Sequence, residues 1–335
     1  MQDNTLVYDI SEEVRFFGRT YEKNGEYYFN WSASGFTFSF IGSGARAVIA
    51  SDAPEENQAY IKIYVDGAEC SVVKLTEAEN TVTLAEGLDP TQKHVVKVLK
   101  RSNVKFSTAS LVRLMLTDGK KLAPEPQSGK YIEFIGDSLT VGYATVANGA
   151  QKWSTDTEDP TLTHAGLIAS AFDADYSVVA ISGWGVARST SGDTERLIPK
   201  IYPFVDQCNL PDVPYDFHRQ PDVIVINLGT NDESSKNTSL TTDEFGAALR
   251  RFLESVRENN PDAYVFYGYG MLKNRLLETV KSTVQQLRDE GDDRIFFVLL
   301  SKLPRELVAI GHPMAPAYIP WSESFIEEIR RVTGW

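Results

Sequence analysis

The sequence is poor in residues that form covalent or metal cross-links. It has only two cysteines, Cys70 and Cys208, far apart in the chain, and four histidines. No two histidines are separated by one or by three residues, so the spacing of a zinc site is missing. We interpret the cysteines as two separate buried thiols, since free cysteine packs as a small apolar side chain. A disulfide framework is excluded.

Long apolar runs and an excess of positive charge are also missing. No stretch approaches the ~20 apolar residues that cross a bilayer, and residues 1–25 lack the basic start and apolar centre of a signal peptide. Lys and Arg number 33 against 46 Asp and Glu, giving a net charge of −13. We therefore expect neither a nucleic acid nor a membrane as partner, because both favour a basic face. The expected location is cytoplasmic; the alternative is a secreted protein whose signal peptide lies outside this sequence.

The first part of the 335-residue chain is patterned as β-structure. Hydrophobic residues make up 42 % of the sequence, which is enough for a core, and the length suits about two domains. Short runs of alternating apolar residues at 36–41, 61–65 and 95–99 are broken by turn residues. Strands at such short spacing predict an all-β sandwich.

The pattern changes after a segment that is rich in turn-forming residues, with Pro124, Pro126 and Gly129. Helical patterns then alternate with apolar runs at 131–135, 176–181, 223–227, 264–267 and 295–300. Thr241 and Glu244 form a capping box ahead of a helix. We predict a β-sandwich at 1–122, a linker at 123–130 and an α/β domain at 131–335. The α/β domain should contain a parallel five-stranded sheet with helices on both faces.

Four segments could carry chemistry, three of them directly after predicted strands: Gly136-Asp-Ser-Leu139, Gly183-Trp-Gly185, Gly229-Thr-Asn-Asp232, and His312 near the end of the chain. Loops at the carboxyl ends of parallel strands are the usual place for reactive groups. Each segment alone also has an ordinary interpretation. Gly-Asp-Ser after a strand is typical of a helix N-cap, and a single histidine before proline is often structural.

Taken together and in this order, the four segments resemble the SGNH, or GDSL, hydrolase superfamily. The segment 131–143, YIEFIGDSLTVGY, behind a β-rich domain with Gly18-Arg19 and Trp31-Ser-Ala-Ser-Gly35 is similar to carbohydrate esterase family 2. The resemblance implies a jelly-roll domain ahead of an SGNH domain. It also implies an esterase that removes O-acetyl groups from acetylated plant oligosaccharides or polysaccharides of the manno- or xylo-type.

The resemblance also implies a role for each motif residue. Ser138 would be the nucleophile and His312 the base that takes its proton. The oxyanion hole would consist of the backbone N–H groups of Ser138 and Gly183 and the side-chain amide of Asn231. No metal and no organic cofactor is required.

One segment departs from the family pattern. Relatives place an aspartate two or three residues before the catalytic histidine, often followed by tryptophan, whereas this chain has Ala309, Ile310 and Gly311. We therefore predict a Ser138–His312 dyad in which a backbone carbonyl orients the imidazole; Glu306 is the weaker candidate for a third member.

Two tryptophans could contact the sugar. Trp184 stands between two glycines beside a proposed oxyanion donor, and Trp321 opens the last predicted helix. Packing in the core is the competing interpretation of each. The alternative to an esterase is a carbohydrate-binding protein with a decayed esterase site, while a lipase or thioesterase is disfavoured because no long apolar lid segment is present. The sequence indicates no particular oligomeric state.

Overall fold

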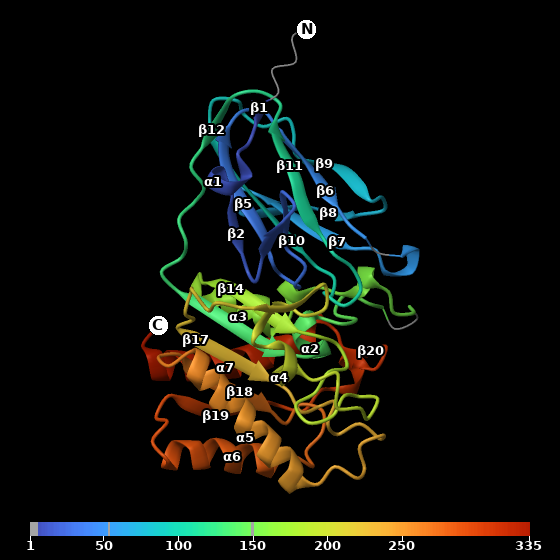
Figure 1. Ribbon diagram of the computed structural model, residues 1–335, viewed down its shortest axis with the longest axis vertical. Helices are drawn as coiled ribbons and strands as arrows, with labels where there is room; N and C mark the ends of the chain where they lie inside the picture. Colours follow the sequence, from blue (N-terminus) through green and yellow to red (C-terminus); the bar gives the residue numbers. More distant parts are fainter. Residues whose placement is uncertain (1–5, 53, 149–150) are drawn as a thin grey trace. The chain divides into compact units, whose positions relative to one another are not determined.

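Antiparallel strands fill the first third of the chain in the computed structural model, which describes residues 6–52, 54–148 and 151–335 (Figure 1). One six-stranded sheet has the order β3-β4-β11-β6-β9 with β1 paired to β11, and the other has the order β12-β5-β10-β7-β8 with β2 paired to β5. The strands of the first sheet are β1 (Leu6–Val7), β3 (Tyr21–Lys23), β4 (Glu26–Tyr28), β6 (Ala45–Ala50), β9 (Glu79–Ala85) and β11 (Ser110–Leu116). Those of the second are β2 (Arg15–Phe17), β5 (Gly35–Ile41), β7 (Tyr60–Val65), β8 (Ala68–Lys74), β10 (Lys93–Lys100) and β12 (Lys120–Leu122). A short helix, α1 (Ile10–Glu13), precedes β2.

The core of this unit lies between the two sheets. Alternate residues of β5, namely Phe36, Phe38 and Phe40, are fully buried and follow one another as stacked rings, with centroids 6.4 and 5.8 Å apart. They pack in one cluster with Ile61 and Ile63 of β7. The predicted all-β sandwich is thereby confirmed.

Strand β8 was not predicted, and it explains an error about the cysteines. It is an edge strand whose residues are exposed almost throughout, so it has no apolar alternation to detect. Cys70 lies on this strand and is exposed, and Cys208 is exposed as well. The interpretation of both as buried thiols is therefore wrong, although they are separate and unbridged.

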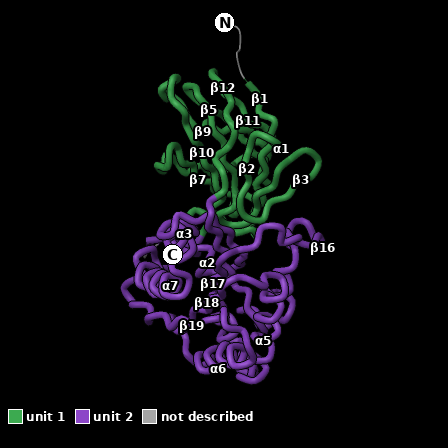
Figure 2. Tube along the Cα trace, turned by 90° about the vertical axis from the view of Figure 1, so that its left-hand side faces the viewer, with its two compact units in different colours: residues 1–127, 154–156 green, residues 128–153, 157–335 purple. Residues whose placement is uncertain are grey.

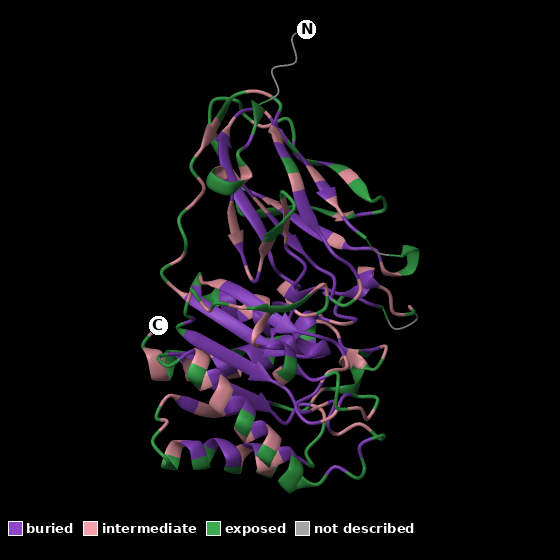
Figure 3. Ribbon diagram, viewed as in Figure 1, coloured by how far each residue is buried: buried purple, intermediate pink, exposed green. Residues whose placement is uncertain are grey.

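The second unit contains a five-stranded parallel sheet in the order β14-β13-β17-β18-β19. The strands are β13 (Tyr131–Gly136), β14 (Asp175–Ala180), β17 (Val223–Asn227), β18 (Tyr264–Tyr269) and β19 (Ile295–Leu299). Two pairs of packed helices flank the sheet: α3 (His164–Phe172) with α7 (Tyr318–Thr333), and α5 (Thr242–Asn259) with α6 (Leu277–Asp289) (Figure 2). The buried strands between partly exposed helices are visible in Figure 3. The predicted α/β domain with helices on both faces is confirmed.

Helix α5 shows how local sequence sets these elements. Both hydrogen bonds of the Thr241–Glu244 capping box are present. Phe245, Leu249 and Val256 lie on the buried face, at helical spacing. The helix ends at its C-cap Asn260, directly before a proline that cannot continue it.

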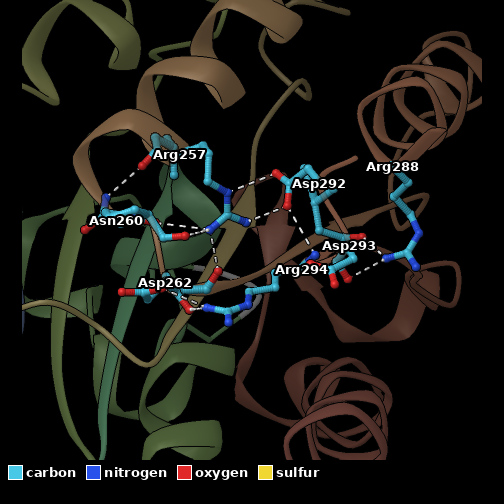
Figure 4. Close-up of polar contacts among 11 residues, drawn as sticks. Arg257, Asn260, Asp262, Arg288, Asp292, Asp293 and Arg294 are labelled. Atoms are coloured by element: carbon cyan, nitrogen blue, oxygen red, sulfur yellow. Dashed lines mark hydrogen bonds and ion pairs between the residues drawn. The ribbon is translucent and has the colours of Figure 1, made fainter. Parts of the chain in front are cut away.

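A polar cluster fixes the amino-terminal ends of β18 and β19 (Figure 4). The guanidinium of Arg257, at the end of α5, donates from Nε and Nη2 to the Asp292 carboxylate at 3.0 Å. It also donates to the Ala263 carbonyl at 2.7 Å. Arg294 donates to the carbonyl of Asp262 at 2.8 Å. These bonds connect the residues that precede β18 and β19. They lie at the amino-terminal ends of the strands, away from the segments that follow the strands.

The chain divides between Gln127 and Ser128, where Figure 2 changes colour. One short segment, Ser154–Asp156, groups with the β-sandwich rather than with the α/β unit to which the sequence assigned it. The reason is local hydrogen bonding: the Thr155 hydroxyl donates to the Gln58 carbonyl at 2.7 Å, and Arg101 donates to the Asp156 carbonyl at 2.9 Å. Among the described residues, no helix is long and apolar enough to span a membrane.

The strand order decides where a site can form. From β13 the chain goes first to β14 on one side, and β17 then pairs with the other side of β13. In the parallel register Gly136 stands beside both Ala180 and Asn227, so the segments that follow the three strands leave the same edge. Such a reversal of strand order opens a crevice at the carboxyl ends of the strands.

Candidate active site

Ser138 sits at a sharp turn between β13 and the short helix α2 (Ser138–Val141). Asp137 caps this helix, and its side chain accepts the Leu139 N–H at 3.0 Å. Gly136 is required at the turn, because a Cβ there would lie 1.9 Å from the Thr140 hydroxyl oxygen. The helix therefore folds back tightly on its strand and holds Ser138 at the sheet edge, 7 % exposed.

His312 reaches Ser138 from a small hairpin, β20 (Val308–Ala309) and β21 (His312–Pro313). The two turn residues, Ile310 and Gly311, have φ angles of +53° and +74°. Positive φ at both positions is the pattern of a type I′ turn, the tightest hairpin connection. Nε2 of His312 lies 2.9 Å from Oγ of Ser138, and Nδ1 lies 3.3 Å from the carbonyl oxygen of Ile310.

This hydrogen bonding defines the tautomer of His312. A carbonyl oxygen can only accept, so Nδ1 carries the proton and Nε2 is free to accept the Ser138 O–H. Burial lowers the pKa of His312 below its usual 6.5, and the hydrogen bond to the Ile310 carbonyl opposes this shift. The ring is thus held neutral at pH 7, in the form that can take a proton from serine.

In the described part of the chain, no carboxylate is hydrogen-bonded to His312. Glu306 lies in a 3-10 turn, Arg305–Leu307, and is exposed. The partner of Nδ1 is the Ile310 carbonyl, which is the dyad arrangement expected from the residues before His312.

Two backbone N–H groups face no acceptor at this edge of the sheet. Neither Ser138 N–H nor Gly183 N–H makes a hydrogen bond to any other described residue. Gly183 follows β14 with φ +85°, a conformation that glycine adopts without the strain it imposes on other residues. Unpaired N–H groups in the segments that follow two neighbouring strands are suited to stabilise an oxyanion.

Asn231 belongs to the same cluster, but its side-chain amide is already engaged. Nδ2 donates to Oδ2 of Asp137 at 3.0 Å and to the Trp184 carbonyl at 2.8 Å. Both of its hydrogens are therefore directed at acceptors within the site. To donate to an oxyanion, Asn231 has to exchange or share one of these bonds.

Two buried aspartates support this cluster: Asp137, the N-cap of α2 that the Gly-Asp-Ser pattern indicated, and Asp232, to which the sequence analysis assigned no role. Asp232 accepts the N–H groups of Val186, Ala187 and Arg188 at 2.9, 2.6 and 2.8 Å, which fixes the loop that carries Gly183. Gly185 makes room for this contact, since a Cβ there would lie 2.5 Å from Oδ2 of Asp232. The signal in the sequence that could have identified Asp232 is its position directly after Asn231.

The electrostatics of the two aspartates follow from burial. Desolvation raises the pKa of Asp137 to about 7; the Leu139 N–H opposes this shift, and the charge of Asp232 adds to it. Desolvation also raises the pKa of Asp232, against the three loop N–H groups. Negative charge is thus costly directly behind Ser138.

The two tryptophans fall in different places. Trp184 is half-buried next to Gly183, and its carbonyl accepts from Asn231. Trp321 is 1 % exposed, donates from Nε1 to the Ser301 carbonyl at 2.8 Å and packs edge-to-face on Tyr318. The prediction that Trp321 binds substrate is wrong: α7 begins before it, at Tyr318, so Trp321 shares the buried helix face with Phe325.

The fold and this set of residues define the SGNH class. The family model "GDSL-like Lipase/Acylhydrolase family" matches residues 134–301, and the model "Carbohydrate esterase 2 N-terminal" matches residues 16–126. The chain belongs to the GDSL-like lipase/acylhydrolase family, and its first domain matches the N-terminal model of carbohydrate esterase 2.

Individual relatives agree with this assignment. Cellulase/esterase CelE of Acetivibrio thermocellus is 30 % identical over 320 residues, which are 91 % of this chain but only 38 % of CelE. An acetylxylan esterase / glucomannan deacetylase of Cellvibrio japonicus is 27 % identical over 79 % of this chain and 75 % of its own length. The structure of a family two carbohydrate esterase from Clostridium thermocellum in complex with cellohexaose superposes with a TM-score of 0.89, at 26 % identity, over 96 % of this chain and 99 % of that one.

Proposed function

We propose that this protein is a serine esterase that removes O-acetyl groups from acetylated plant oligosaccharides or polysaccharides through an acetyl-enzyme on Ser138. The observation that carries the proposal is the 2.9 Å contact between Oγ of Ser138 and Nε2 of His312, beside two unpaired N–H groups. A nucleophile, a base in the correct tautomer and donors for an oxyanion are the parts that acyl transfer requires.

In the first half of the reaction, His312 takes the hydroxyl proton of Ser138 as Oγ attacks the acetyl carbonyl carbon. The carbonyl π electrons move to its oxygen, where the N–H groups of Ser138 and Gly183 stabilise the negative charge. Collapse of this intermediate breaks the bond to the sugar oxygen. His312 gives its proton to that oxygen, and the deacetylated sugar leaves.

In the second half, water replaces the sugar. His312 takes a proton from the water as the water oxygen attacks the acetyl carbon of the acetyl-enzyme. The same N–H groups stabilise the second oxyanion. Collapse of this second intermediate breaks the bond between the acetyl carbon and Oγ of Ser138. His312 gives its proton to Oγ, and acetate is released. No step needs a redox partner or a metal ion.

The names of the relatives support the substrate class. The Cellvibrio proteins are described as acetylxylan esterase / glucomannan deacetylase, and the clostridial structure contains cellohexaose. We therefore propose acetylated xylo- or manno-oligomers as substrates. Trp184, half-buried beside Gly183, is our candidate for contact with the sugar.

The alternative is a carbohydrate-binding protein with a decayed esterase site. Only the residues before His312 favour it, and the Ile310 carbonyl occupies the place of the missing acid. A decayed site has no need of the close contact between Ser138 and His312.

Acetate release from purified protein tests the proposal. Wild-type protein should hydrolyse 4-nitrophenyl acetate and release acetate from acetylated xylan and glucomannan. Ser138→Ala should lose several orders of magnitude in kcat while its melting temperature stays close to that of the wild type. Binding of these polysaccharides by the wild type without acetate release would establish the alternative instead.

A further inference from the structure

An aromatic ring stands against the imidazole of His312. The ring centroids of Tyr143 and His312 are 4.2 Å apart with planes inclined by 40°. Trp153 stacks parallel to Tyr143, with centroids 5.1 Å apart and planes within 4°. The three rings form a row in which Tyr143 is the middle member.

The backbone holds Tyr143 in this place. Its N–H donates to the Ser138 carbonyl at 3.0 Å, so the residue follows directly from the helix of the nucleophile. Gly142 before it has φ +79°, and a Cβ there would lie 2.4 Å from the Asp159 carbonyl oxygen. The position of the ring is therefore fixed by the same turn that fixes Ser138.

Tyr143 also belongs to the apolar cluster that joins this turn to the hairpin of His312. The buried members are Ala144, Ala147 and Ala309, and Tyr143, Ile310 and Met314 pack against them. The same two segments are tied by a hydrogen bond from the Ala315 N–H to the Thr145 carbonyl at 3.0 Å. Tyr143 thus contacts the imidazole and packs in the same cluster as Ala309 and Ile310 of the hairpin that carries it.

His312 needs such a restraint because the hydrogen bond from its Nδ1 to the Ile310 carbonyl is weak. The Nδ1 to Ile310 oxygen distance of 3.3 Å is longer than a typical N–H···O bond. The carbonyl also lacks the full charge of a carboxylate. Rotation of the ring would separate Nε2 from Ser138, so a flat surface against its face has a mechanical function.

We propose that Tyr143, supported by Trp153, is a positioning residue that acts together with the Ile310 carbonyl to orient His312 in the absence of a catalytic acid. The row of rings also excludes water from one face of the imidazole, and so holds the base neutral. The kinetic consequence rests on the esterase function proposed above, whereas the placement of the ring does not.

The surroundings of His312 allow a clear test of pH dependence. The groups that face it are the Ser138 hydroxyl, the Tyr143 ring and the Ile310 carbonyl. Within the described residues, burial and the Ile310 bond are the causes of its shift, and no charged side chain contributes. Two carboxylates belong to the neighbouring segments: the buried Glu158 raises the pKa of the Tyr143 hydroxyl, with burial as the larger cause, and Glu306 is exposed on the turn before the hairpin.

The test compares Tyr143→Leu with Tyr143→Phe in the full chain. Leucine removes the ring, whereas phenylalanine keeps it and should restore function. Tyr21→Leu is a matched control, because Tyr21 stacks on Tyr28 at 4.9 Å and 5° in the β-sandwich. The readouts are the pH profile of kcat/KM with 4-nitrophenyl acetate and the titration of His312 by NMR of ¹⁵N-labelled histidine. The His312 signal is assigned by its loss in His312→Asn.

We expect Tyr143→Leu to lose about 10- to 100-fold in kcat with little change in KM, and the pKa of His312 to move up toward its ordinary value of about 6.5. Tyr143→Phe and Tyr21→Leu should keep the wild-type titration. An unchanged titration in Tyr143→Leu would overturn the proposal, even if the protein proves not to be an esterase. If Tyr143→Leu does not fold, Trp153→Leu should give a smaller shift of the pKa in the same direction, and no shift there would also overturn it.

Discussion

Replacing Asn231 with alanine should slow the chemical step without weakening substrate binding. A side-chain donor to an oxyanion is worth about 2.7–4 kcal/mol. Here the Asn231 amide first has to give up one of its two hydrogen bonds. The bond to the neutral Trp184 carbonyl is the weaker of the two and is worth about 1 kcal/mol. The net contribution is about 2–3 kcal/mol, so kcat should fall roughly 30- to 150-fold.

The KM of Asn231→Ala should stay within about threefold of wild type, since the interaction strengthens only as negative charge forms on the carbonyl oxygen. The assay is steady-state hydrolysis of 4-nitrophenyl acetate and of an acetylated oligosaccharide at a pH above the titration of His312. An effect confined to KM would make Asn231 a contact of the bound substrate and would refute the reasoning.

Stability has to be separated from chemistry, because the alanine variant also removes a donor from the buried Asp137 carboxyl. Loss of this bond should cost about 1–3 kcal/mol in the free energy of unfolding. Asn260→Ala is the matched control: this asparagine is fully buried and donates to the Tyr202 hydroxyl at 2.7 Å and to the Val256 carbonyl at 2.9 Å. It should lower the melting temperature with kcat unchanged. Equal losses of kcat in both variants would show that the effect is structural.

Three further predictions concern the histidines. Because burial lowers the pKa of His312 and the base must be neutral, kcat/KM should rise with pH through an apparent pKa below 6.5, and a midpoint above 7 would contradict the dyad. Glu306→Gln should leave kcat within about threefold, whereas His312→Ala should lose nearly as much as Ser138→Ala; a loss of about 10³ in Glu306→Gln would place an acid behind the imidazole after all. In the β-sandwich, bonds to Asp66 at 2.8 Å and to the Asp89 carbonyl at 2.9 Å raise the pKa of His94. The resulting stability should be present below pH 6.5 and lost as pH rises through the raised pKa. Urea unfolding at pH 6 and pH 9 checks this. Between these pH values, His94→Gln should lose less free energy of unfolding than the wild type. An equal loss in both proteins would show that His94 is not the cause.

The sequence alone was sufficient for features that depend on neighbours along the chain. The capping box of Thr241 and Glu244 and the apolar face of α5 are matters of helical spacing, and both appear in the structure. Enough of the core strands carry an apolar pattern to define the two fold classes, among them β5, β7 and β10 and the five strands of the parallel sheet; β9 and β11 were not predicted. Ser138 and His312 were proposed as site residues because four motifs in their order along the chain resemble one family, although each motif alone is unspecific.

The tertiary structure decided whatever depends on contacts between distant segments. Ser138 and His312 are 174 positions apart, and only the strand order and the hairpin turn bring their side chains to 2.9 Å. Trp321 is a core residue because the actual start of α7 sets which face it occupies. Strand β8 escaped prediction because an exposed edge needs no apolar pattern, only a neighbouring strand with which to pair.

The contacts of Asp232 and Tyr143 belong to this second group, whereas the cap made by Asp137 is local and was indicated by its motif. A carboxylate that accepts three N–H groups of another loop, or a ring that lies against an imidazole, leaves no periodic trace in the chain. The sequence specified the reactive groups through their chemistry. Their orientation came from the packing around them, because the energy of a hydrogen bond or a ring contact depends on distances and angles that local sequence does not determine.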